Sequence, residues 1–191
     1  MAGGAASRMG KNKLDLKING ESIINCVIKC AKNSKLNEIV LVYGKYEFDV
    51  DLPKIFNPDF SQGMSTSVKA GLKYGAGSKV YNGDAVMFLL GDMPFVTEDI
   101  INKLINSFEQ SDKNIAVPIF EDRRGNPVII GKKYFESLMN NTGDKGAREI
   151  IKNNLEDVLW VNVQSDGIFV DIDDKEGYKK VAEKTSIAVV K

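Results

Sequence analysis

Small residues and two cations near the start of the chain form the first group that could do chemistry. Gly3, Gly4 and Ser7 lie in a run of small residues, and Arg8 and Lys13 add positive charge. Backbone N–H groups of such a run can approach a phosphate closely, and the two cations can neutralise it. The segment predicts a loop that binds the triphosphate of a nucleotide, although its sequence is neither a Walker motif nor a dinucleotide-binding fingerprint. The alternative is a flexible chain end.

A single carboxylate follows an apolar run. Residues 86–90 are Val-Met-Phe-Leu-Leu, and Gly91 and Asp92 come directly after them. In parallel sheets, ligands collect at the carboxyl ends of strands, so the preceding strand would deliver Asp92 to such a place. One carboxylate there suits Mg²⁺, which takes a few protein oxygens together with phosphate oxygens. The alternative is a turn-forming aspartate before Pro94.

A second acidic segment lies near the end of the chain. Asp171 and Asp173 are two residues apart, which in an extended strand places them on the same side. Either carboxylate could complete a metal site. The alternative is a solvated turn or the N-cap of a following helix.

Further polar residues stand where elements are expected to begin. Ser65 and Ser67 open a predicted helix whose hydroxyls and amides could bind a base or a phosphate, and Asn126 begins a predicted strand. Lys145 and Arg148 lie at another helix start, where free N–H groups attract an anion. For these two cations, an ordinary capped helix start is the alternative.

Composition restricts the chemistry that is possible. The chain has no histidine, which removes the usual zinc sites and every mechanism with an imidazole base. The 26 basic residues equal the 26 acidic ones, so no overall field favours nucleic acid or an anionic membrane. Cys26 and Cys30, four residues apart, fit structural thiols better than a metal or redox pair. Without a bilayer-spanning run or a secretory signal pattern, we expect a cytoplasmic protein.

The elements that must position these residues alternate between strands and helices. A length of 191 residues predicts one domain, and the alternation predicts an α/β fold with a largely parallel sheet. The expected strands are 38–43, 84–90, 114–119, 126–130 and 158–163. The expected helices are 20–33, 65–74, 98–109, 132–139, 145–153 and 175–184, and residues 45–61 and 75–83 are expected to be loops. A phosphate-binding glycine loop normally follows a strand, yet no apolar run precedes Met1, so either a strand lies upstream or the loop is anchored differently.

In their order, these segments resemble the molybdenum cofactor nucleotidyltransferases over nearly the whole chain. The segments that carry the resemblance are residues 3–13, 62–71, 91–94, 125–128, 143–148 and 171–173. Gly-Met-Ser-x-Ser and Gly-Asp-Lys-Gly-Ala-Arg are typical of the cytidylyltransferase branch, whereas Ala2-Gly3-Gly4 is typical of guanylyltransferases. Asn126 stands where the family commonly has histidine, and Asp174-Lys175 replaces the usual Thr-Pro.

The resemblance implies a three-layer α/β/α, Rossmann-like, mostly parallel fold of the nucleotide-diphosphosugar transferase type, formed by residues 1–191 as a single domain. It implies a Mg²⁺-dependent enzyme that transfers a nucleoside monophosphate, with CMP favoured, from an NTP to the terminal phosphate of molybdopterin and releases pyrophosphate. The roles that the resemblance assigns are phosphate binding by Gly3, Gly4, Ser7, Arg8 and Lys13, metal binding by Asp92 and Asp173 with Asp171 as the alternative, and substrate contacts by Ser65, Ser67, Asn126, Lys145 and Arg148.

Three other functions stay open. GTP in place of CTP would make the chain a molybdenum cofactor guanylyltransferase. The wider superfamily also contains nucleotidyltransferases for other small molecules, such as sugar phosphates. A non-catalytic accessory protein that binds the cofactor for a molybdoenzyme or its chaperone is the alternative from another class.

Overall fold

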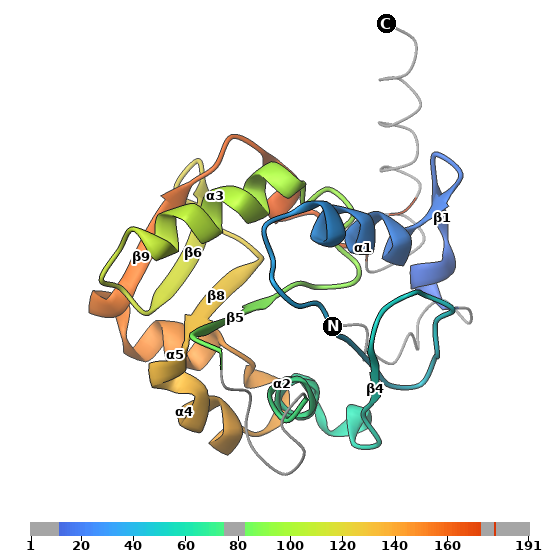
Figure 1. Cartoon of the computed structure of the whole chain (residues 1–191), viewed down its shortest axis with the longest axis horizontal. Coiled ribbons are helices and arrows are strands. Elements are labelled where there is room, and N and C mark those ends of the chain that lie inside the picture. Colours follow the sequence, from blue (N-terminus) through green and yellow to red (C-terminus); the bar gives the residue numbers. More distant parts are fainter. Residues whose placement is uncertain (1–11, 75–82, 173–177, 179–191) are drawn as a thin grey trace, which may run out of the picture.

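The computed structural model of the chain describes residues 12–74, 83–172 and 178 (Figure 1). Its helices are α1 (Ile23–Asn33), α2 (Met64–Leu72), α3 (Glu98–Glu109), α4 (Phe135–Asn140) and α5 (Arg148–Asn153). Its strands are β1 (Lys17–Ile18), β2 (Glu21–Ser22), β3 (Leu41–Tyr43), β4 (Lys54–Phe56), β5 (Ala85–Phe88), β6 (Ile115–Phe120), β7 (Arg123–Arg124), β8 (Val128–Gly131) and β9 (Val158–Asn162). Short 3-10 turns join several of these elements. No helix within the described ranges has the length and apolar character needed to cross a membrane.

The main sheet of the described residues contains five strands. β8 lies between β5 and β6 and runs antiparallel to both, and β6 also pairs with β7 antiparallel and with β9 in parallel. β5, β6 and β9 therefore point in one direction. β3 and β4 form a separate parallel pair, and β1 and β2 form a short hairpin.

Helices cover both faces of the main sheet. Ile115 and Val117 of β6 pack into one apolar cluster with α2, α4 and α5, while Ala116 between them packs into a second cluster with α3. This alternation follows from the period of two along a strand. Figure 1 shows α1 and α3 on one side of the strands and α2, α4 and α5 on the other. The predicted three-layer α/β fold is confirmed.

One strand runs against the predicted direction. The segment expected at 126–130 is β8, Val128–Gly131, and it is antiparallel to its two neighbours. The chain returns from β6 to β8 through the two-residue strand β7, and so short a connection cannot cross over to begin a parallel strand. The sheet is therefore mixed in its pairing, although β5, β6 and β9 share a direction.

Several predicted boundaries were wrong. The helix expected from Gly20 begins at Ile23, after Gly20 turns the β1–β2 hairpin with a φ of 85° and Ser22 caps α1 through Asn25 N. The strand expected at 38–43 is reduced to β3, and the one expected at 84–90 to β5. The helices expected at 65–74 and 132–139 are α2 and, after a 3-10 turn, α4.

The expected loop at 45–61 contains a strand. Lys54–Phe56 forms β4 beside β3, and a 3-10 turn follows at Phe60–Gln62. Lys54 and Phe56 are exposed in this short strand, so the sequence lacks an apolar alternation that would reveal it. The loop expected at 75–83, except Gly83, and the helix expected at 175–184, except Tyr178, lie outside the described residues.

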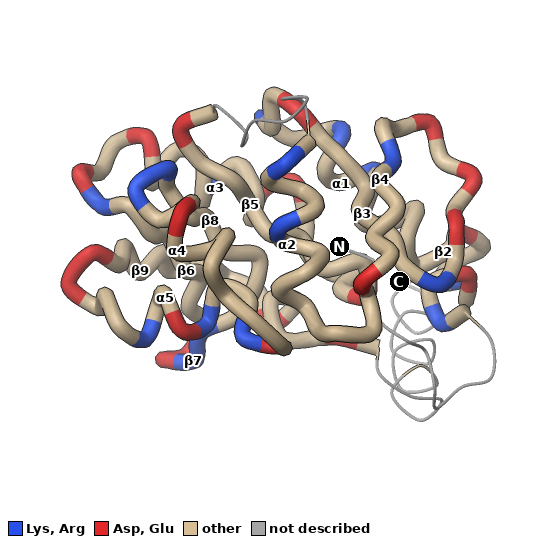
Figure 2. The backbone as a smooth tube through the Cα atoms, turned by 90° about the horizontal axis from the view of Figure 1, so that it is seen from below, with Lys and Arg blue, Asp and Glu red and all other residues tan. Residues whose placement is uncertain are grey.

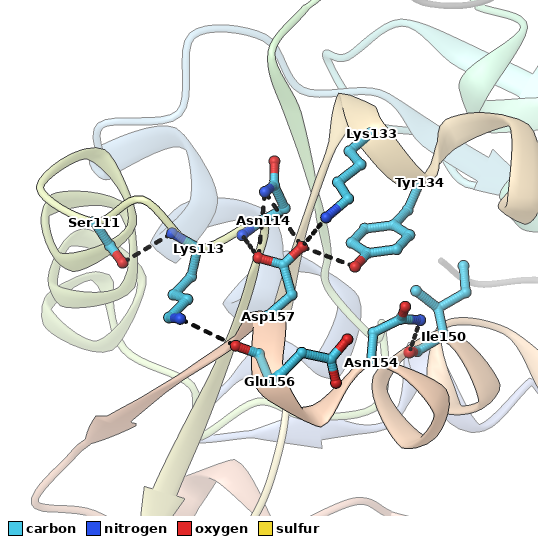
Figure 3. A network of polar contacts seen from close by, with 9 residues as sticks. All are labelled: Ser111, Lys113, Asn114, Lys133, Tyr134, Ile150, Asn154, Glu156 and Asp157. Atoms are coloured by element: carbon cyan, nitrogen blue, oxygen red, sulfur yellow. Dashed lines mark hydrogen bonds and ion pairs between the residues drawn. The ribbon is translucent and has the colours of Figure 1, made fainter.

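A buried carboxylate connects the amino ends of β6 and β9 through hydrogen bonds (Figure 3). Asp157, only 9% exposed, accepts hydrogen bonds from Asn114 N at 3.0 Å, Lys133 Nζ at 2.7 Å and the Tyr134 hydroxyl at 2.8 Å. Burial opposes ionisation, but the hydrogen bonds from Lys133, Tyr134 and Asn114 outweigh it and hold the pKa of this carboxyl far below its usual range. The network joins the elements before β6, after β8 and before β9.

We expect Asp157→Asn to lower the free energy of unfolding by roughly 2–4 kcal/mol, because an amide cannot accept from all the donors around it. Folding lowers the pKa of Asp157, so its contribution is full above the unfolded pKa of about 4 and is lost as the pH falls toward the folded value. Denaturant unfolding between pH 7 and pH 3 measures both effects. Glu156→Asn, at the exposed neighbouring position, is the matched control, and equal unfolding curves for the two variants would contradict this role.

Candidate functional site

An ion pair joins the start of the described chain to the end of β5. Lys13 Nζ lies 2.7 Å from Asp92 Oδ2, and the two side chains are 18% and 22% exposed. Lys13 begins a 3-10 turn, Lys13–Asp15, whose N-cap Asn12 accepts from Leu14 N. Asp92 follows β5 by four residues and lies beyond its carboxyl end. The ion pair therefore sits at the edge of the sheet where ligands of α/β proteins collect.

The second acidic segment lies directly against Asp92. Ile172 N donates to the carbonyl oxygen of Asp92 at 3.1 Å, and the Ile172 side chain is fully buried in a cluster that includes Leu14 and Ile18. Asp171 is exposed, and Asp173 lies outside the described residues. The backbone of residues 171–172 therefore contacts the backbone of Asp92.

Close backbone packing fixes the segment that leads to Asp171. A Cβ atom on Gly167 would lie 2.4 Å from Phe95 O, and one on Gly125 would lie 2.4 Å from Ile168 O. Asn126 N donates to Ile168 O at 3.0 Å, which brings the predicted residue Asn126 to the same segment. Asn126 is half-buried.

Two segments predicted to bind phosphate separately meet at the start of α2. Asp144 Oδ1 accepts from Met64 N at 3.1 Å and so caps one of the free amides at this helix end. The contact depends on Gly63, whose φ of 109° and ψ of 174° suit only glycine. A Cβ atom there would lie 2.5 Å from the carbonyl carbon of Gly143. The Gly63–Met64 and Gly143–Asp144 segments therefore form one structural unit.

Ser65 and Ser67 point into the protein. They are 1% and 5% exposed, and Ser67 Oγ accepts from Asn57 Nδ2 at 3.0 Å. Asn57 Nδ2 also donates to Thr66 Oγ1 at 2.8 Å, and Asn57 N donates to Tyr43 O. Asn57, itself buried, thus holds the end of β4 to α2. The sequence analysis missed it because residues 45–61 were expected to be a loop.

The two cations expected at the next helix lie on the surface. Lys145 Nζ pairs with Glu149 Oε1 at 2.8 Å, with the two side chains 51% and 44% exposed. Arg148 is exposed at the first position of α5. Gly146, with a φ of 48°, ends the preceding 3-10 turn. The helix expected at 145–153 therefore begins at Arg148. Within the described ranges, neither Lys145 nor Arg148 forms a hydrogen bond or an ion pair with Asp92.

The remaining predicted phosphate ligands, Gly3, Gly4, Ser7 and Arg8, lie outside the described residues, as does Asp173. Within the described ranges, no group of three or more His, Cys, Asp or Glu side chains gathers in a way that could hold a metal ion. The carboxylate of Asp92, partly exposed and beside a cation, is an oxygen donor of the kind Mg²⁺ prefers when substrate phosphates complete its shell. The site therefore fits a metal that binds together with a nucleotide.

The two cysteines form a different kind of pair. Cys26 and Cys30 are free and half-buried on α1, and burial raises the pKa of each thiol. A protonated thiol is a poor metal ligand and a poor nucleophile. These thiols therefore fit the structural role expected from the sequence.

Comparisons with known proteins found similar sequences and similar folds. Residues 1–158 match the MobA-like NTP transferase domain. The chain is 27% identical over 198 residues to the purine catabolism protein PucB of Bacillus subtilis, covering 97% of this chain and 95% of that protein. It is 25% identical to the molybdenum cofactor cytidylyltransferase of Escherichia coli, with 96% and 93% covered. The crystal structure of a Mycobacterium tuberculosis Rv0371c homologue from Mycobacterium sp. strain JC1 has the same fold, with a TM-score of 0.81, 20% identity, and 98% and 94% of the two chains covered.

We expect Gly63→Ala to lower the free energy of unfolding by roughly 3 kcal/mol. Alanine is strained in the backbone conformation of Gly63, and its Cβ atom would also clash with Gly143. The matched control is Gly20→Ala, at a φ of 85° but with open space around the added Cβ, which we expect to cost about 1 kcal/mol. Thermal and denaturant unfolding of the two variants separates strain from clash. Equal losses would show that the contact between residues 63 and 143 contributes nothing.

Proposed function

The chain belongs to the MobA-like NTP transferase family, and from this premise we propose that it transfers CMP from CTP to the terminal phosphate of molybdopterin, with release of pyrophosphate. The observation that carries the proposal is the Lys13–Asp92 ion pair beyond the carboxyl end of β5, with the Asp171–Ile172 segment hydrogen-bonded to Asp92. A cation, a carboxylate and a second acidic segment in one place are what a triphosphate and its metal need.

The reaction needs no nucleophile from the protein. A phosphate oxygen of the acceptor attacks the α-phosphorus in line, and the bond to pyrophosphate breaks. Arg8 and Lys13 would hold the phosphates of the nucleotide and take up charge that develops on the leaving group. Mg²⁺, held by Asp92 and by Asp173 or Asp171, would supply further stabilisation of this charge. The absence of histidine is compatible with this chemistry.

Before the substrate binds, Lys13 would also balance a negative charge. Its ammonium group balances the charge of Asp92 across 2.7 Å, in a place that is still partly exposed. An ammonium group has three N–H donors, so a phosphate oxygen could accept a hydrogen bond from Lys13 while Asp92 stays beside it. On this proposal, Lys13 already lies beside Asp92 when the nucleotide binds.

The choice of CTP rests on two segments that meet in space. Gly63–Ser67 and Gly143–Arg148 are typical of the cytidylyltransferase branch, and the bond from Met64 N to Asp144 Oδ1 brings them together. The relative named as a molybdenum cofactor cytidylyltransferase aligns over nearly its full length, which supports the same choice. Ala2-Gly3-Gly4 favours GTP, which makes guanylyl transfer the second candidate.

Pyrophosphate release with each of the four NTPs, Mg²⁺ and molybdopterin tests the function. We expect release with CTP in preference to GTP, ATP and UTP. Preference for GTP would assign a guanylyltransferase, and release that needs a sugar phosphate in place of molybdopterin would assign a different nucleotidyltransferase. Tight binding of molybdopterin without turnover would indicate an accessory protein that passes the cofactor to a molybdoenzyme.

We expect Asp92→Ala to abolish pyrophosphate release while the fold remains intact, because this carboxylate would hold the metal where transition-state charge appears. Circular dichroism and an unfolding curve check the fold. Asp99→Ala, an exposed acidic position in the first turn of α3, is the matched control and should leave turnover unchanged. Release by the Asp92 variant at the wild-type rate would contradict the metal assignment.

Arg8→Ala should lower kcat/KM on the order of 10²-fold or more, the scale for loss of one preorganised charge stabiliser. Steady-state kinetics with saturating molybdopterin and varied CTP measure the effect. Arg124→Ala removes an arginine from the exposed strand β7 and should change kcat/KM far less. If Arg8→Ala matches the wild type, the first loop is not the triphosphate cradle.

A further inference from the structure

An arginine stacks on an aromatic ring just beyond the carboxyl end of β6. The guanidinium carbon of Arg123 lies 4.3 Å from the centroid of the Phe169 ring. Phe169 also packs against Phe120, with the two ring centroids 6.4 Å apart. A cation–π contact of this kind holds a guanidinium group in place without using its N–H donors. Within the described ranges, the Arg123 side chain forms no hydrogen bond and no ion pair, so these residues leave its donors to a ligand.

The hairpin before Arg123 fixes the direction of its side chain. Glu121 and Asp122 both have a left-handed backbone, with φ of 48° and 59°, which suits the tight two-residue turn between antiparallel strands. Arg123 pairs directly with Phe120, so the two side chains lie on the same face of the ribbon. Arg124, the next residue of β7, lies on the opposite face. The fold therefore directs one of two neighbouring arginines toward the aromatic ring.

The stacked arginine lies at the same end of the sheet as Asp92. Met87 of β5 and Ala116 of β6 pair with the same residue, Ile129 of β8, so these two positions are level across the sheet. Asp92 and Phe120 follow them by similar distances along the chain, and β5 and β6 point in one direction. Only β8 separates the two strands, which places them two strand spacings, or roughly 10 Å, apart. This spacing suits two substrates that react with each other.

One chain segment connects the aromatic ring to Asp92. Phe169 shortly precedes Ile172, whose N–H group donates to the carbonyl oxygen of Asp92 at 3.1 Å. Asn126 N donates to the carbonyl oxygen of the residue before Phe169 at 3.0 Å. The chain that follows Arg123 is therefore fixed to the same segment as the chain at Asp92.

We propose that Arg123, held in place by Phe169, binds the phosphate monoester of the acceptor substrate. The inference rests on the proposed function, in which an acceptor phosphate attacks a nucleotide bound at Asp92. The fork of a guanidinium group matches two phosphate oxygens at once, and a phosphate monoester has a third non-bridging oxygen that stays free to attack. A cation at this place also reduces the repulsion between the acceptor phosphate and the triphosphate.

The two residues have different roles in this proposal. Arg123 touches the substrate, whereas Phe169 acts through Arg123 and is a positioning residue. An exposed arginine has many side-chain conformations, and binding a ligand in one of them costs conformational entropy. The contact with the Phe169 ring restricts the guanidinium group before the ligand binds, which lowers that cost.

Calorimetric titration with molybdopterin, in the absence of any NTP, tests the contact without turnover. We expect Arg123→Gln to raise Kd about 10- to 100-fold, the scale for loss of hydrogen bonds to a charged group. Arg123→Lys keeps the charge and loses the fork, so it should raise Kd only about 3- to 10-fold. Arg124→Gln, on the opposite face of β7, is the matched control and should leave Kd unchanged. The KM for CTP should be the same in all of these variants.

Phe169→Leu tests the positioning role. In the wild-type background it should raise Kd for molybdopterin about 3-fold, because the cation–π contact is lost. In a protein that already carries Arg123→Gln it should cause no further change. Equal effects in the two backgrounds would show that Phe169 does not act through Arg123.

The remaining outcomes separate this proposal from the proposed function. The same titration with glucose 1-phosphate supplies a phosphate monoester without a pterin. Binding of either compound that Arg123→Gln weakens, without pyrophosphate release from any NTP by the wild type, would support the role of Arg123 and contradict nucleotidyl transfer. Equal affinity of Arg123→Gln and the wild type for both compounds, including no measurable binding by either protein, would overturn the role of Arg123. A raised KM for CTP with unchanged affinity for the acceptor would also overturn it, because Arg123 would then bind the nucleotide.

Discussion

The contact between Lys13 and Asp92 is the constraint on which the candidate site depends. It joins residues 79 positions apart, and it fixes where the chain that follows the glycine-rich segment enters the fold. The two side chains are only 18% and 22% exposed, so the protein covers most of the pair. The backbone on both sides of the pair is held by the packing of Leu14 and Ile172 and by the hydrogen bond from Ile172 N to Asp92 O.

The two ends of the strands in the main sheet carry different kinds of polar group, and Figure 3 shows the group at the amino ends of β6 and β9. At the amino ends of β6 and β9, Asp157 is buried and satisfied by several donors, so it has no capacity left for a ligand. Beyond the carboxyl end of β5, Asp92 is partly exposed and pairs with Lys13. The buried carboxylate stabilises the fold, and the partly exposed one is the carboxylate that we propose holds the metal. Figure 2 shows acidic and basic residues spread over many elements, consistent with the equal numbers of the two charges.

Much of this arrangement could be predicted from the sequence. The apolar runs located β5, β6 and β9, and the helical period located α1 and α3, because each buries a regular face. The direction of β8 could not be predicted, since it depends on the short return through β7, and β4 has too few buried residues to produce a pattern. The proximity of Lys13 and Asp92 agrees with the site that the resemblance implies, but the roles of these residues stay predictions. Tertiary packing, which no local sequence pattern encodes, brings the Gly63–Met64 segment to Asp144. It also buries Ser65 and Ser67 beside Asn57.

The central claim is that the triphosphate binds beyond the carboxyl end of β5. The most direct measurement is a crystal structure of the chain with Mg²⁺ and a non-hydrolysable CTP analogue. We expect an Asp92 carboxylate oxygen about 2.1 Å from the metal and Lys13 Nζ within hydrogen-bonding distance of a phosphate oxygen. A nucleotide bound elsewhere, with the Lys13–Asp92 ion pair still closed at 2.7 Å, would contradict it.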